Sequence, residues 1–287
     1  CACLVGSEMC IRDSYSTTDL ATLVMRMKEN NPDRVIYLAD ARQSMHFIQV
    51  FRCARKTGIV PDTTELVHIG FGTMNGKDGK PFKTRDGGVM RLEYLLKEID
   101  DEMLNKIKEN QKEKENLNID EAEAEQTAKT VALAAVKYGD LSNQASKDYI
   151  FDIDRFTSFE GNTGPYILYT IVRIKSILSK YEAKGGDISA LKDAIMPAVN
   201  AGQKNLMLSL AKFNATIESA YEESAPHKIC AYIYELANAF NGFYHDTKIL
   251  SEENEELKKS YISLLVLTKE ILEACIDMLG FSAPDRM

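Results

Sequence analysis

The run Val35-Ile36-Tyr37-Leu38-Ala39 decides the fold of the first part of this chain. It is short, apolar and rich in β-branched and aromatic residues, which is typical of a buried parallel strand. Residues 43–57 then show helical spacing and stop at Gly58, and the run from Leu66 to Met74 predicts a second strand. A strand, a helix and a second strand in this order predict a crossover unit with a parallel sheet.

Polar residues follow the first strand at its carboxyl end, where Asp40, Ala41, Arg42 and Gln43 come directly after Ala39. Ligands of open parallel sheets bind beyond the carboxyl ends of the strands. The second strand is followed by the basic segment Gly79-Lys80-Pro81-Phe82-Lys83-Thr84-Arg85-Asp86-Gly87-Gly88. Its glycines let the backbone approach a ligand closely, and its cations match a polyphosphate that gains negative charge during reaction. By themselves these residues fit an exposed basic loop equally well.

The length and composition of the chain limit which kinds of protein it can be. The chain has 287 residues, of which 45% are hydrophobic, so it can form one large domain or two ordinary ones. Its net charge of −8 excludes nonspecific phosphate neutralisation as the main source of any nucleic-acid binding. No apolar run is long enough for a membrane span, no secretory signal is visible, and the six scattered cysteines form no CxxC pair. We therefore expect a cytoplasmic protein with reduced thiols, no metal site and no membrane partner.

The second part of the chain has helical periodicity. From Gly164 onward four apolar stripes at helical spacing predict a helical bundle, with Ser251 as the N-cap of the last helix and Gly280 as its stop. Residues 101–127 are highly charged, which favours a solvated helix or a mobile insertion over a binding surface. These patterns predict an α/β domain at 1–100, a charged insertion and connecting region at 101–164, and an all-α domain at 165–287.

Eight segments resemble those of one family in order and spacing. They are Tyr15–Ala21, Ala41–Gln49, His68–Gly72, Lys83–Gly88, Tyr138–Ser142, Phe159–Tyr166, Phe240–His245 and Leu279–Met287. Together they resemble the arginyl-tRNA synthetases, a class I family, almost from end to end. The resemblance implies that residues 1–100 form the second half of a Rossmann-like catalytic domain and that residues 165–287 form the α-helical anticodon-binding domain.

The resemblance also implies the reaction and its partners. Arginine attacks the α-phosphate of ATP, which gives arginyl-adenylate and pyrophosphate, and the arginyl group then passes to tRNA(Arg). ATP with Mg²⁺ would be a substrate, with no tightly bound cofactor, and the protein would act as a monomer in the cytoplasm. The family usually requires bound tRNA even for the first step.

The arginine-binding residues that the resemblance implies are Tyr15, Asp19 and Gln43. A guanidinium is planar and permanently charged, so a specific pocket needs a carboxylate within bidentate reach. Asp19 matches that family position, and Tyr15 lies four residues earlier, on the same helical face. Without the resemblance, Asp19 would be an ordinary helix-capping carboxylate and Tyr15 a core tyrosine.

The ATP-binding residues that it implies are His46, Lys80, Lys83 and Arg85. His46 lies one turn after Gln43 and would face the nucleotide, although a lone histidine is more often structural. The three cations resemble a degenerate form of the class I KMSKS loop, in which Lys83 and Arg85 would stabilise the charge that develops on the β- and γ-phosphates. His68, at a strand start, is expected to be structural.

In the helical part, tRNA contacts would come from residues that stack on or read splayed anticodon bases. Tyr244, His245 and Met287 are the candidates, whereas Phe240 and Phe243 fit the core better. The class I HIGH signature does not occur in the sequence. The similar letters His68-Ile69-Gly70-Phe71 are not that signature, because they lie after the Tyr15–Asp19 motif, in the wrong place for it. We therefore expect that this chain alone cannot form arginyl-adenylate. A non-catalytic tRNA-binding module and a generic nucleotide-binding protein with a helical interaction domain remain the alternatives.

Overall fold

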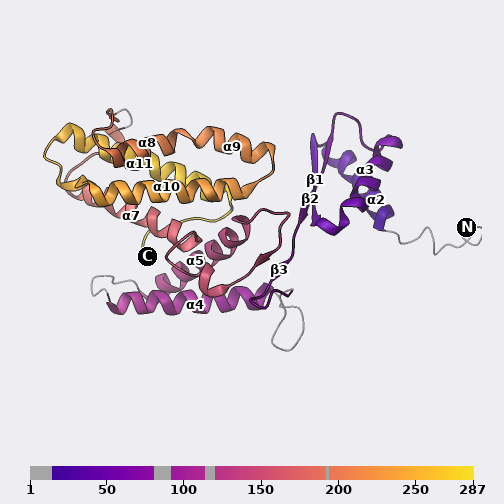
Figure 1. Ribbon diagram of the computed structural model, residues 1–287, viewed down its shortest axis with the longest axis horizontal. Helices are drawn as coiled ribbons and strands as arrows, with labels where there is room; N and C mark the ends of the chain where they lie inside the picture. Colours follow the sequence, from indigo (N-terminus) through magenta and orange to yellow (C-terminus); the bar gives the residue numbers. More distant parts are fainter. Residues whose placement is uncertain (1–14, 81–91, 114–119, 192–193) are drawn as a thin grey trace, which may run out of the picture. The chain divides into compact units, whose positions relative to one another are not determined.

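The computed structural model describes residues 15–80, 92–113, 120–191 and 194–287 (Figure 1). By its internal contacts the chain divides into two compact units. We call them the sheet unit, Cys1–Thr73 with Ala145–Tyr149, and the helical unit, Met74–Gln144 with Ile150–Met287. Each unit is described by itself below.

The sheet unit contains the predicted strand–helix–strand arrangement. Its elements are α2 (Tyr15–Asn30), β1 (Arg34–Asp40), the 3-10 turn η2 (Ala41–Gln43), α3 (Ser44–Lys56) and β2 (Glu65–Phe71). β1 and β2 are parallel and in register from the Arg34–Glu65 pair to the Asp40–Phe71 pair. Gly58, with φ +71°, ends the α3 region as expected. The predicted parallel sheet and its connecting helix are therefore confirmed.

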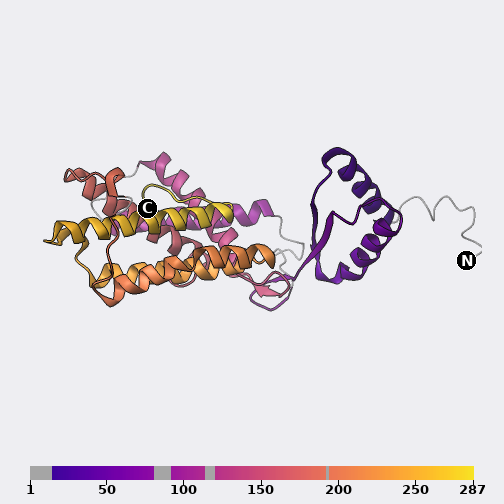
Figure 2. The same ribbon diagram turned by 90° about the horizontal axis from the view of Figure 1, so that it is seen from above.

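Helices α2 and α3 cover the same face of the two-stranded sheet (Figures 1 and 2). Buried residues of both helices, of β1 and of the segment before β2 form the core between them: Leu23, Val35, Val50, Ala54 and Val60. Side chains alternate between the two faces of a strand, so Ile36 and Leu38 point away from this core. They are 47% and 68% exposed. In the described residues the predicted buried strand is therefore covered on one face only, because both helices lie on the same side of the sheet.

Two short strands, β3 (Met74–Asn75) and β4 (Tyr149–Ile150), form a second sheet. The chain leaves β3 through a tight turn at residues 76–80. In this turn the Gly76 amide donates to the Lys80 carbonyl at 2.8 Å and the Gly79 amide donates to the Gly76 carbonyl at 2.9 Å. Gly79 has φ +71°, a conformation that glycine adopts without strain. The turn therefore defines the backbone at the start of the basic segment.

The charged region 101–127 is mostly helical and is not wholly solvated. Helix α4 (Leu92–Glu113) buries one face through Leu95, Ile99, Met103 and Ile107, and it packs against α5 (Glu121–Leu141). Its charged residues occupy the other positions of the helix, which is the pattern of an amphipathic surface helix. Asp120 caps α5 by accepting from the Glu123 amide at 2.8 Å.

The rest of the helical unit is built on α7 (Gly164–Ala183), α10 (Pro226–Asp246) and α11 (Glu255–Met278), with the short helix α6 (Ile153–Phe156) and the turns η3 (Ser189–Leu191) and η4 (Ile249–Ser251). The second of the four predicted apolar stripes, which runs from Leu206 to Tyr221, is divided between α8 (Ala201–Ala211) and α9 (Phe213–Glu222). The break at Lys212 has no proline or glycine to mark it. Helix α11 starts later than predicted, since Asn254 caps it in place of Ser251, and Gly280 stops it with φ +81°. The fold class, an α/β unit with a helical domain, is as predicted.

Candidate functional site

The structure joins two of the predicted site residues directly. His46 Nε2 lies 2.7 Å from Asp19 Oδ2, and the two side chains are only 26% and 25% exposed. Asp19 is in the second turn of α2 and His46 is in the first turn of α3, so the bond connects the two helices that cover the sheet. His46 was expected to face the nucleotide; here it contacts the carboxylate assigned to arginine.

Aromatic and polar groups surround this pair on the helix-covered face of the sheet. The Phe47 ring stacks on His68 at 4.7 Å and contacts Tyr37 at 4.9 Å. Burial raises the pKa of the Tyr37 hydroxyl, Arg26 opposes that shift, and the nearby Asp19 charge adds to it. Tyr37 and His68 are paired residues of β1 and β2, and the Tyr37 hydroxyl and His68 Nε2 are both buried without a hydrogen-bond partner in the described part of the chain. His68 lies in the middle of β2 and not at a strand start, and its ring packs on Phe47; a structural role for it stays a prediction.

Tyr15 and Gln43 are not brought into a closed pocket. Tyr15 is 85% exposed at the start of α2, so its side chain is neither a core tyrosine nor enclosed in a pocket. Gln43 is exposed and is the N-cap of α3, where its side chain makes no capping bond. Next to it, the Asp40 carboxylate accepts from Arg42 Nε at 2.9 Å and from the Arg42 amide at 2.8 Å, and these bonds lower the pKa of Asp40 to about 2. At the carboxyl end of β1, the exposed amide of Gln43 thus lies beside an ionised Asp40 whose charge is paired with Arg42.

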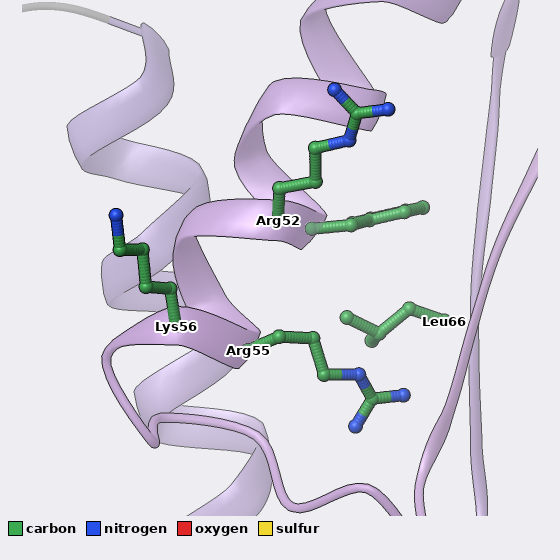
Figure 3. Close-up of a pocket in the computed structure, with 5 residues that line it drawn as sticks. Arg52, Arg55, Lys56 and Leu66 are labelled. Atoms are coloured by element: carbon green, nitrogen blue, oxygen red, sulfur yellow. The ribbon is translucent and has the colours of Figure 1, made fainter.

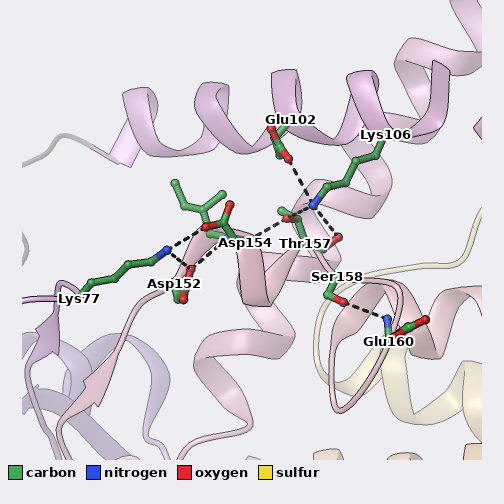
Figure 4. Close-up of polar contacts among 9 residues, drawn as sticks. Lys77, Glu102, Lys106, Asp152, Asp154, Thr157, Ser158 and Glu160 are labelled. Carbon is green, nitrogen blue, oxygen red and sulfur yellow. Dashed lines mark hydrogen bonds and ion pairs between the residues drawn. The ribbon is translucent and has the colours of Figure 1, made fainter. Parts of the chain in front are cut away.

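Of the predicted phosphate-binding cations, Lys80 is exposed at the end of the turn at residues 76–80, where its amide donates to Asp78 Oδ1 at 3.1 Å. Lys83 and Arg85 lie outside the described residues. Lys77, in the same turn, is bound by two carboxylates near the start of α6: its Nζ lies 2.8 Å from Asp154 Oδ2 and 3.0 Å from Asp152 Oδ1 (Figure 4). The hydrogen bond to Lys77 holds the pKa of Asp154 below its ordinary value. This ion-pair cluster anchors the turn that precedes the basic segment.

Helix α4 is hydrogen-bonded to Thr157, which directly follows α6 and its ion-pair cluster. Lys106 Nζ donates to Thr157 Oγ1 at 2.7 Å and lies 3.3 Å from Glu102 Oε1, while the Glu160 amide donates to the Ser158 hydroxyl at 3.1 Å (Figure 4). The Lys106–Thr157 bond connects α4 with the segment between α6 and α7, and the Glu160–Ser158 bond shapes that segment itself. Sequence reasoning missed them, because single lysines in a highly charged region carry no local signal.

A basic hollow lies at the other end of α3. Phe51 and Leu66 form its apolar part and Arg52, Arg55 and Lys56 surround it, with a volume of about 510 Å³ (Figure 3). Arg55 bonds the carbonyls of Pro61 and Thr64 and so serves the loop before β2. Because Gln43 and His46 lie at the start of α3 and this hollow lies at its end, it includes none of the predicted site residues.

In the helical unit, Arg173 lies between two tyrosines. Its guanidinium carbon is 4.7 Å from the centre of the Tyr169 ring and 5.3 Å from that of Tyr244. Its Nη1 donates to Asn241 Oδ1 at 2.6 Å. Of these residues only Tyr244, half-exposed on α10, was among the predicted tRNA contacts. Arg173 is stacked and hydrogen-bonded, so it holds both rings in place.

Hydrogen bonds extend this cluster along α7 and α10. The Asn241 amide donates to the Tyr166 hydroxyl at 2.9 Å, and that hydroxyl donates to Asn238 Oδ1 at 2.6 Å. Tyr166, Tyr169 and Arg173 recur at spacings of three and four residues on one face of α7. This polar and aromatic pattern inside an apolar stripe was the sequence signal that could have revealed the cluster.

The other predicted tRNA contacts are placed separately. His245 is almost fully exposed, with Nδ1 3.2 Å from Asp246 Oδ1. Met287 is half-buried at the end of a tail that Lys175 binds through the Ala283 and Pro284 carbonyls, at 3.4 and 3.3 Å, and the Asp285 carboxylate, at 3.2 Å. Phe240 and Phe243 are fully buried, as expected for core residues.

The described ranges contain neither a metal cluster nor a membrane-spanning helix. No group of three or more His, Cys, Asp and Glu side chains is arranged there to hold a metal ion. No helix in those ranges combines the length and the apolarity that a membrane crossing requires.

Comparison with known proteins places both parts of the chain. Residues 12–153 match the family described as "tRNA synthetases class I (R), catalytic domain", and residues 167–287 match the DALR anticodon binding domain. Over 273 residues the chain is 55% identical to the arginine–tRNA ligase of Alkaliphilus oremlandii. The chain belongs to the arginyl-tRNA synthetase family. It is also 44% identical over 275 residues to the arginine–tRNA ligase of Francisella tularensis.

Solved structures of arginyl-tRNA synthetases are similar to this chain along most of its length. That of Plasmodium falciparum has a TM-score of 0.78 at 28% identity and covers 96% of this chain. That of Thermus thermophilus has a TM-score of 0.73 at 24% identity and covers 89% of it, which supports the fold alone. The chain spans 45% of the length of both arginine–tRNA ligases and of the Plasmodium protein. The resemblance read from the sequence is confirmed.

Proposed function

We propose that this chain is part of an arginine–tRNA ligase, which attaches L-arginine to tRNA(Arg) through arginyl-adenylate with consumption of ATP. The observation that carries the proposal is the tandem match to a class I arginyl catalytic domain and a DALR anticodon binding domain. The 55% identity to an arginine–tRNA ligase supports the choice of amino acid. ATP would arrive with Mg²⁺ as a substrate, and the proposal includes action as a monomer in the cytoplasm.

Arginine is assigned to the carboxyl end of the sheet and the facing start of α2. Asp19 supplies the carboxylate that a guanidinium requires, and Gln43 offers an amide to the substrate ammonium or carboxylate without adding charge. Tyr15 is assigned to the same site through its helical position relative to Asp19. Its high exposure means that the tyrosine hydroxyl orients the substrate only once further groups enclose it.

ATP is assigned to the basic segment that begins at Lys80, with Lys83 and Arg85 on the β- and γ-phosphates. Cations placed where charge develops stabilise the transition state by electrostatics, without a covalent step. The turn at residues 76–80, anchored through Lys77 to Asp152 and Asp154, supports the placement of Lys80.

The tRNA is assigned to the face of α7 and α10 around Arg173. Tyr169 and Tyr244 offer ring surfaces for splayed bases, and the exposed Asn238 offers an amide that can read base edges. His245 and Met287 stay in the proposal as flanking contacts. The net charge of −8 favours recognition of individual bases over general phosphate attraction.

A non-catalytic tRNA-binding module is the second candidate. It is favoured by the match of residues 167–287 to the DALR anticodon binding domain, which is a match to a binding domain and not to a catalytic one. Both candidates retain the helical domain, so tRNA binding alone does not distinguish them.

The deciding experiment is arginine-dependent exchange between ATP and labelled pyrophosphate, with tRNA(Arg) present and with lysine in place of arginine as the control. We expect exchange in the full-length protein with arginine only, and none in the 287-residue chain alone. Full-length protein that binds tRNA(Arg) without any exchange would favour the second candidate. Exchange with lysine equal to that with arginine would exclude the assigned specificity.

A further inference from the structure

We propose that His46 is a positioning residue for arginine recognition, acting through Asp19, and is not a nucleotide contact. The inference rests on the proposed function and deepens it, since it assigns the orientation of the guanidinium-binding carboxylate to a named side chain. Its basis is the 2.7 Å contact between His46 Nε2 and Asp19 Oδ2.

The direction of this hydrogen bond follows from the groups that make it. An ionised carboxylate can only accept, so His46 must carry its proton on Nε2 and donate it to Asp19. The bond spans 27 residues of sequence and joins α2 to α3, so it is part of the packing of two helices and not a local turn. The His46 ring is also in edge-to-face contact with Phe47, with centroids 5.1 Å apart.

The bond leaves Asp19 able to receive a substrate. One imidazole proton occupies one lone pair of Oδ2, and a carboxylate has about four such sites over its two oxygens. Oδ1 and the second lone pair of Oδ2 remain for a guanidinium. Because both side chains are about three-quarters buried, water competes weakly for the bond and the carboxylate plane is held in one orientation.

A fixed carboxylate plane matters for arginine more than for other cations. A guanidinium is a planar fork that needs two parallel hydrogen bonds, whereas an ammonium is a compact charge with freely rotating donors. Loss of His46 would let the Asp19 carboxylate rotate, which would weaken arginine binding and reduce the preference for arginine over lysine. Binding of ATP would be unchanged, because the contacts of His46 are with Asp19 and Phe47.

The test is a comparison of His46→Ala, His46→Gln and Gln49→Ala in the full-length protein, by pyrophosphate exchange. Gln49 is exposed on the same helix and is the matched control. We expect His46→Ala to raise KM for arginine by about 10- to 100-fold, the usual effect of a hydrogen bond to a charged group, with KM for ATP within about twofold. His46→Gln, whose amide can still donate, should recover most of the loss, and Gln49→Ala should match the wild type.

A second measurement shows whether His46 acts through Asp19. In an Asp19→Asn background, His46→Ala should add little further loss, since the carboxylate that it positions is already gone. Circular dichroism must show that each variant is folded; if His46→Ala is not, the His46→Gln and Asp19→Asn comparison still decides. In the 287-residue chain, the nuclear magnetic resonance signal of the His46 Nε2 proton should be seen in the wild type and lost in Asp19→Asn.

The outcomes separate this proposal from the proposed function. If the wild type shows no arginine-dependent exchange, the function itself fails and this inference fails with it. If the wild type is active but His46→Ala raises KM for ATP and leaves KM for arginine unchanged, the function stands and His46 is a nucleotide contact. Full additivity of the two substitutions would likewise overturn the positioning role.

Discussion

Gly164 at the start of α7 lies directly against Ala134 of α5, so closely that a Cβ on Gly164 would be 2.4 Å from the Ala134 carbonyl oxygen. That oxygen belongs to a helix backbone and cannot rotate away. The helices α5 and α7 therefore meet at a position where only glycine fits. Because α7 carries Tyr166, Tyr169 and Arg173, this contact helps to place the proposed tRNA surface.

Gly164→Ala should destabilise the protein by about 1–3 kcal/mol, because the helices must move apart or strain to admit the methyl group. The matched control is Gly242→Ala, at a helical glycine whose added Cβ would meet nothing within 4 Å. That variant should be stabilised by about 0.5–1 kcal/mol through helix propensity alone. Urea unfolding followed by circular dichroism measures both, and equal effects at the two positions would contradict the packing argument.

Arg173→Ala should weaken binding of tRNA(Arg) by about tenfold, because the two tyrosine rings lose the cation that separates and orients them. Arg173→Lys should recover little, since lysine has the charge but neither the plane nor the fork. Lys180→Ala, an exposed position on the same helix, is the control. Fluorescence anisotropy with labelled tRNA at two salt concentrations gives the affinities. Wild-type affinity in Arg173→Lys would show that charge alone suffices.

Asp40 should stay ionised in acid where ordinary aspartates are protonated. Its pKa is lowered to about 2, chiefly by the side-chain hydrogen bond from Arg42, against an ordinary value of 3.8. A carboxyl whose folded pKa is depressed contributes stability above the unfolded pKa and loses it as pH falls from about 4 towards 2. The Asp40 carboxyl ¹³C shift, followed by nuclear magnetic resonance, should titrate in that low range. In Arg42→Ala the midpoint should return close to the ordinary value, and an unchanged midpoint there would disprove the assigned cause.

The exposed cysteine Cys53 should react with alkylating reagents faster than the buried Cys230 and Cys275. Cys53 is exposed, whereas Cys230 and Cys275 are buried, and burial raises the pKa of each of these two thiols to about 12. Thiolates and not thiols are the nucleophiles, so iodoacetamide at mildly alkaline pH should modify Cys53 in the native protein and reach the other two only after unfolding. Peptide mass mapping distinguishes the sites, and rapid native labelling of Cys230 would contradict the buried helical core.

Local periodicity predicted the elements whose signals are local. The β-branched run in β1, the helical spacing of α3 and the glycine stop of α11 all depend on neighbouring residues, and each was found. The exposure of Ile36 and Leu38 was not predictable, because the strand pattern does not say how many faces are covered. The division between α8 and α9 also carried no signal, since Lys212 is an ordinary helix former.

The sequence predicted which residues belong to the candidate site, but not which of them contact one another. Asp19 and His46 were each singled out, but their bond spans 27 residues and depends on how two helices pack. Arg173 was not singled out: its spacing from Tyr166 and Tyr169 on α7 is visible in the sequence, but its contact with Tyr244 depends on how α7 and α10 pack.

The exposed apolar face of β1 predicts how this protein behaves at high concentration. Ile36 and Leu38 form an exposed apolar surface next to a strand edge, and this combination promotes self-association. Concentrated preparations should scatter light increasingly as ammonium sulfate is added, and Leu38→Lys should suppress that turbidity.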